Sequence, residues 1–212
     1  MHRLRFFILL FAVSSLLFHF PFDFEVFADP GDVASTEKID DSTSNGPTLA
    51  DGDYFGRALA NIGDLDGDGV TDFAVGAYGD QTGATSNGAV YIMFMNPNGT
   101  LKSTAKIDDS TANGPELQGS VDHFGYSVAN MGDRDDWDGE DGIVLAVGAH
   151  GNDSEDGFPI GDYTGAVYIM FIDTDGTIDR TEKIDDSNAP LALVNSDSFG
   201  FSVANIGDLD GD

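Results

Sequence analysis

The feature that most constrains the fold of this chain is an internal repeat. The string KIDDS stands at residues 38–42, 106–110 and 183–187. Between its copies a Phe-Gly pair, an acidic loop, a Val-Gly-Ala triplet and the seven-residue string GAVYIMF recur in the same order. A chain of such units folds as a row of similar elements, each packed on its neighbours.

Each unit predicts four short strands. In the first unit they span Tyr54 to Ile62, Asp72 to Tyr78, Ala89 to Met95 and Leu101 to Ile107. The third strand is apolar on both faces, which requires a sheet on either side of it. Four antiparallel strands per unit, stacked face to face, predict an all-β fold made of β-propeller blades. A linear β-solenoid is the alternative, but its repeats are usually far shorter.

An acidic loop joins the first two strands. Residues 64–72 read DLDGDGVTD, with aspartates at loop positions 1, 3, 5 and 9 and a glycine at position 6. Alternate residues of a tight loop point inward, and the glycine permits the turn that returns the last carboxylate to the same centre. Ca²⁺ takes roughly six to eight oxygen ligands, whereas Mg²⁺ demands a rigid octahedron. The predicted calcium ligands are Asp64, Asp66, Asp68, the carbonyl of Val70, and Asp72.

An EF-hand is the obvious competitor for this pattern. It requires a glutamate at loop position 12, where this chain has Val75, and helices on either side, where we predict strands. The EF-hand is therefore excluded. An acidic turn without a metal stays open as the other interpretation of the loop.

The second and third copies of the loop depart from the pattern. In the second, residues 136–140 (DWDGE) look inserted, and residues 144–148 (VLAVG) leave no carboxylate at position 9. Asp136 or Asp138 could substitute for it, which leaves a weaker site open. The third copy is cut off by the end of the chain. The further candidate ligands are Asp133, Asp135 and Asp141 in the second copy, and Asp208, Asp210 and Asp212 in the third.

The composition excludes several functions. With 38 acidic and 9 basic residues the formal net charge is −29, which disfavours nucleic acids and anionic membranes as partners. There is no cysteine, and neither a Gly-x-Ser-x-Gly motif nor a phosphate-binding loop. We interpret His123 and His150 as structural residues of the blades. No catalytic site is predicted in this segment.

The first 28 residues predict a secretory signal peptide. Arg3 and Arg5 precede an apolar run over residues 6–20, and residues 26–28 (VFA) offer a cleavage site before Asp29. An uncleaved membrane anchor is the alternative, but the apolar run is short for a span. We therefore predict a protein that is secreted or displayed on the extracellular cell surface, with no membrane span after cleavage.

The landmarks of the repeat resemble those of the FG-GAP family. Residues 55–56 (FG), 64–72 and 75–77 (VGA) carry the resemblance, with Tyr78 in place of the family's usual proline. The resemblance extends over roughly residues 38–212 and implies a β-propeller like that of integrin α chains, where seven blades form the head. Residues 29–212 are then a partial propeller, with repeats at about 38–105, 106–182 and 183–212. The last repeat is truncated, so we expect the chain to be a fragment.

The resemblance also implies a function. It points to a secreted or cell-surface calcium-binding module for adhesion or ligand recognition, with an extracellular protein or glycan as partner. The alternative is a set of accessory blades in a larger secreted hydrolase or lyase, whose catalytic part lies outside this chain. A purely structural surface-layer component is a third option.

Overall fold

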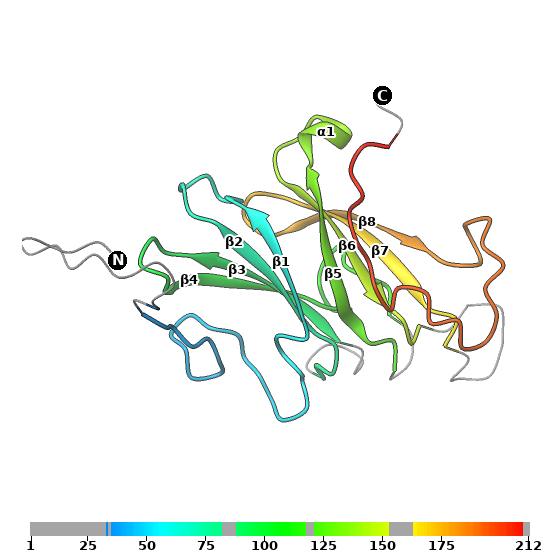
Figure 1. The fold of residues 1–212 in the computed structure, drawn as a ribbon, viewed down its shortest axis with the longest axis horizontal. Coiled ribbons are helices and arrows are strands. Elements are labelled where there is room, and N and C mark those ends of the chain that lie inside the picture. Colours follow the sequence, from blue (N-terminus) through cyan, green and yellow to red (C-terminus); the bar gives the residue numbers. More distant parts are fainter. Residues whose placement is uncertain (1–32, 34, 82–87, 118–120, 153–162, 210–212) are drawn as a thin grey trace, which may run out of the picture. The chain divides into compact units, whose positions relative to one another are not determined.

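The described chain is built around two four-stranded antiparallel sheets (Figure 1). The computed structural model describes residues 33, 35–81, 88–117, 121–152 and 163–209. The predicted signal peptide, Asp210 and Asp212 lie outside these residues. The chain divides into residues 1–36 and 37–212, and all the strands belong to the second unit. Within the described residues, no helix has the length and apolar character needed to cross a membrane.

The two sheets have the same order of strands, and each strand pairs with the next one along the chain. The first blade contains β1 (Ala58–Gly63), β2 (Asp72–Ala77), β3 (Ala89–Met95) and β4 (Leu101–Ile107). The second blade contains β5 (Phe124–Asp133), β6 (Ile143–Ala149), β7 (Ala166–Ile172) and β8 (Ile178–Ile184), with a short helix α1 (Asp135–Asp138) between β5 and β6. The predicted all-β blades of four antiparallel strands are confirmed.

The first strand of the first blade is shorter than predicted. It begins at Ala58 rather than at Tyr54, because the chain makes a turn before it. Tyr54 and Gly56 have φ angles of 54° and 87°, which are incompatible with an extended strand. The second strand ends at Ala77, one residue before Tyr78.

Both faces of the third strand in the first blade are buried, but within the described residues another sheet covers only one of them. One face of β3, formed by Val90, Ile92 and Phe94, belongs to a hydrophobic cluster that also contains residues of β6 and β7. The other face, which includes Tyr91 and Met93, belongs to a second cluster within the first blade. Burial of both faces explains why this strand has no alternation of apolar and polar residues.

The blades also meet through their backbones. Gly88 forms an isolated parallel bridge with Phe124, and a Cβ on Gly76 would lie 1.9 Å from the carbonyl oxygen of Gly125. The same contacts recur one repeat later, where Gly165 meets Phe199 and Gly148 meets Gly200. Residues 199–200 therefore occupy, beside the second blade, the place that residues 124–125 occupy beside the first.

Candidate metal centre

The predicted calcium loop lies between β1 and β2. Carboxylate oxygens of Asp64, Asp66 and Asp72 lie within 4.8 Å of one another. No other group of three acidic or histidine side chains in the described part of the chain converges in this way. The turn that closes the loop uses Gly69, whose φ of 87° favours glycine, as the sequence predicts.

Asp72 anchors the end of the loop at the first residue of β2. Its side chain has no exposed surface, and it accepts hydrogen bonds from the backbone N–H groups of Leu65 (3.0 Å) and Met95 (2.9 Å). Burial raises the pKa of the Asp72 carboxyl, although these hydrogen bonds oppose the shift. A buried carboxylate of this kind favours a cation beside it.

Two further aspartates shape the turn. Asp64 accepts hydrogen bonds from the N–H groups of Asp68 (2.9 Å) and Gly69 (2.8 Å), and Asp68 accepts one from the N–H of Val70 (3.0 Å). Each carboxylate oxygen carries more than one lone pair, so these bonds leave acceptor capacity for a metal.

Asp66 provides the observation that fits a cation best. Its Oδ1 atom is buried and has no hydrogen-bond partner. Buried carboxylate oxygens normally have a partner, and an unpaired anionic oxygen is costly. Because Asp66 belongs to the group formed with Asp64 and Asp72, a cation bound there could satisfy this oxygen.

Lys102 on β4 is a part of the site that the loop pattern does not reveal. Its Nζ atom lies 2.7 Å from Oδ2 of Asp66 and 2.6 Å from Oδ2 of Asp68. Hydrogen bonds to these two carboxylates raise the pKa of Lys102, and the bond to Lys102 lowers the pKa of Asp68. The protein itself thus brings one positive charge to two of the predicted metal ligands.

The second loop places its aspartates differently. Asp133, Asp135 and Asp141 are exposed, and they do not converge as the first-loop aspartates do. Val144 pairs with Gly132 just as Asp72 pairs with Gly63 in the first blade. The strand register therefore places a buried valine where the first loop has its ninth-position carboxylate.

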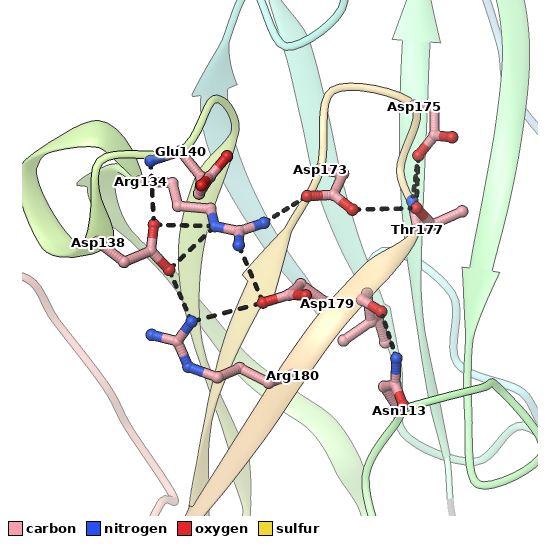
Figure 2. Close-up of polar contacts among 10 residues, drawn as sticks. Asn113, Arg134, Asp138, Glu140, Asp173, Asp175, Thr177, Asp179 and Arg180 are labelled. Carbon is pink, nitrogen blue, oxygen red and sulfur yellow. Dashed lines mark hydrogen bonds and ion pairs between the residues drawn. The ribbon is translucent and has the colours of Figure 1, made fainter.

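An arginine lies at the centre of the second loop. Figure 2 shows the guanidinium of Arg134 among the carboxylates of Asp138, Asp173 and Asp179. Nε lies 3.1 Å from Asp138 and Nη2 lies 2.9 Å from Asp179, while only 4% of Arg134 is exposed. Asp138 also accepts a hydrogen bond of 2.6 Å from Arg180. Asp138, one of the two aspartates that could substitute for the missing ninth-position ligand, thus contacts two guanidinium groups.

Comparison with known proteins identifies the repeat. The sequence profile of the FG-GAP repeat matches residues 55–93, from the Phe-Gly pair through the acidic loop into β3. Residues 55–93 are an FG-GAP repeat.

The chain is similar to integrin α chains. Integrin alpha-4 of Xenopus laevis is 32% identical over 161 residues, which is 76% of this chain and 14% of the relative. Integrin alpha-3 of Cricetulus griseus is 34% identical over 161 residues, or 75% and 13% of the two chains. Integrin alpha-PS2 of Drosophila melanogaster is 38% identical over 99 residues, or 47% and 7%. The chain thus spans at most 14% of the length of these three relatives.

The first and second loops line one cleft of about 440 Å³. Its lining includes Asp64 and Asp66 from the first loop, and Asp133 and Asp141 from the second. A cleft with this lining favours cations over anions. Of the third loop, Asp208 is exposed, and the other two candidate ligands lie outside the described residues.

His123 and His150 lie in an aromatic cluster. The rings of His123 and His150 stack with their centroids 4.8 Å apart, and the ring of Tyr126 lies 4.1 Å from that of His150. Burial lowers the pKa of His150 to about 4, so its ring is neutral at pH 7. This packing agrees with the structural role expected for both residues.

Proposed function

We propose that this protein is a calcium-binding β-propeller module for adhesion or ligand recognition outside the cell. The observation that carries the proposal is the first loop, where three aspartates converge and one of them, Asp66, has a buried carboxylate oxygen without a partner. The similarity to integrin α chains supports the recognition role. The module is non-catalytic in this segment, and its partner is an extracellular protein or glycan.

We also propose that the protein is secreted and that its chain is organised as a signal peptide followed by propeller repeats. Residues 1–28 act as a signal peptide, and residues 29–212 belong to a propeller with repeats at about 38–105, 106–182 and 183–212. The strong acidity suits a surface that meets calcium-rich extracellular medium. It gives little support to binding of nucleic acid.

Calcium would act on the first loop as a structural ion. Asp64, Asp66, Asp68, Asp72 and the carbonyl of Val70 would hold it. Ca²⁺ would supply positive charge to carboxylates that otherwise repel one another. At millimolar calcium, even a site with a Kd of about 10⁻⁴ M adds roughly 1–2 kcal/mol to the free energy of unfolding.

Removal of calcium tests the proposal. We expect EDTA to lower the melting temperature by roughly 2–8 °C relative to 1 mM CaCl₂, measured by differential scanning calorimetry at pH 7.4. The double variant Asp64→Asn, Asp66→Asn is the control, and its melting temperature should not respond to calcium. Equal melting of the unchanged protein with and without the chelator would contradict a structural calcium site.

Lys102→Met tests whether the ammonium group competes with the metal. Because Lys102 must give up Asp66 and Asp68 when calcium binds, we expect its removal to tighten calcium binding roughly three- to tenfold. Isothermal titration calorimetry at fixed ionic strength measures this change. Lys38→Met removes the same charge from an exposed lysine outside the loop and is the matched control. If both variants bind calcium equally well, Lys102 does not compete.

A further inference from the structure

The two blades differ in charge at equivalent positions. Leu65 and Arg134 each follow the first aspartate of their loops. Lys102 and Asp179 each follow the residue that starts the last strand of the blade, Leu101 in β4 and Ile178 in β8. From the first blade to the second, a buried leucine thus becomes arginine, and a lysine becomes aspartate.

A third position changes with these two. Asn96 and Asp173 start equivalent turns, since their N–H groups donate to the carbonyls of Thr100 and Thr177. The neutral side chain of Asn96 is replaced by the carboxylate of Asp173, which binds Arg134. The inserted residues of the second loop add Asp138, at the end of α1. One of these four differences supplies a guanidinium, and the other three place carboxylates around it.

The guanidinium of Arg134 is suited to such a place. It stays charged at every relevant pH, and its planar fork of N–H donors fits several carboxylates at once. Nε, Nη1 and Nη2 each contact a different aspartate (Figure 2). The buried charge is therefore fully paired, which is the condition under which a buried ion pair is tolerated.

We propose that Arg134 is a built-in counter-ion that takes the place of a metal ion in the second loop. The contrast with the first loop rests on the proposed function, but the role of Arg134 in its own blade does not. A guanidinium at the centre of the loop repels a second cation and occupies the nearby carboxylates. The first blade then depends on calcium in the medium, whereas the second blade keeps its structure without it.

The test uses the double variant Asp64→Asn, Asp66→Asn as parent, so that the first loop contributes no calcium response. With Arg134 intact, added CaCl₂ should leave the melting temperature unchanged. Arg134→Leu, which installs the residue of the first blade, should lower the melting temperature in EDTA by roughly 5–10 °C. Because Asp173 then loses its counter-ion, and Asp138 and Asp179 keep only Arg180, CaCl₂ should restore part of this loss.

Two further variants separate charge from packing. Adding Asp173→Asn and Asp179→Asn to Arg134→Leu removes the uncompensated carboxylates and should recover at least half of the lost melting temperature in EDTA. Arg134→Lys keeps the charge without the fork and should lose less than Arg134→Leu, without responding to calcium. It also keeps the test informative if Arg134→Leu does not fold.

Two results would overturn the role of Arg134. One is a calcium response of the parent that disappears when Asp133, Asp135 and Asp141 are changed to Asn, since calcium would then bind the second loop beside the arginine. The other is a neutralised variant as unstable as Arg134→Leu, since Arg134 would then act by packing alone. Failure of the proposed function looks different: the unchanged protein would not respond to calcium, while the recovery by neutralisation would persist.

Discussion

Asp72→Val should destabilise the first blade by about 3 kcal/mol and lower its melting temperature by roughly 6–12 °C. The carboxylate of Asp72 is fully buried and accepts the N–H groups of Leu65 and Met95. Without it both donors lose their acceptor inside the protein, at a cost of about 1–3 kcal/mol each. Loss of the buried charge offsets part of this cost. Loss of calcium adds to it, because valine offers no ligand.

Two further variants serve as controls for Asp72→Val. Asp72→Asn keeps one oxygen acceptor and should lose about half as much stability in EDTA, while still binding calcium poorly. Asp51→Asn removes an exposed charge from the turn over residues 50–53 and should change the free energy of unfolding by less than about 0.5 kcal/mol. Urea unfolding with and without calcium measures all three variants. Asp72→Val with the stability of Asp51→Asn would show that Leu65 and Met95 find other acceptors.

The second blade explains why a valine is tolerated at the equivalent position there. Val144 has no exposed surface and lies where the second loop has no convergent carboxylates. Arg134 holds that loop instead, through contacts with β8 and the turn before it. Asp72→Val would install the valine without the arginine, so the first loop would lose its anchor and gain none.

Much of the fold could be predicted because the repeat carries it. The string GAVYIMF is apolar at every position after its glycine, so its strand had to be covered on both faces, and β3 and β7 are nearly fully buried. The start of β1 could not be predicted in the same way. Tyr54 has a positive φ although it is not glycine, and no local sequence pattern predicts a positive φ at such a residue.

The candidate site, like the fold, could be predicted from the sequence only in part. The ligands of the first loop lie within nine residues of one another, so their spacing alone predicts convergence. Lys102 lies on another strand, and Arg134 finds Asp173 and Asp179 about 40 residues further along the chain. Contacts of this kind depend on strand register, which the loop pattern does not contain. Alignment of the repeats does show a signal, namely the exchanges of Leu65 for Arg134, Asn96 for Asp173 and Lys102 for Asp179.

Gly76→Ala should force the first two blades apart. The added Cβ would lie 1.9 Å from the carbonyl oxygen of Gly125, and a backbone atom cannot rotate away as a side chain can. Gly76 does not have a positive φ, so alanine suits its backbone and the expected effect is steric. Overpacking at such a contact costs about 3 kcal/mol, which lowers the melting temperature by roughly 6–12 °C.

Gly99→Ala is the matched control for Gly76→Ala. Gly99 has a φ of 83° in an open turn, with nothing within 4 Å of an added Cβ, so only backbone strain of about 1 kcal/mol is expected. Gly148→Ala repeats the clash one blade later, with the carbonyl of Gly200, and should behave like Gly76→Ala. Thermal unfolding of the three variants gives the order. If Gly76→Ala lowers the melting temperature no more than Gly99→Ala does, β2 and β5 can move apart to admit the methyl group. The close backbone contact then does not set the spacing of the blades.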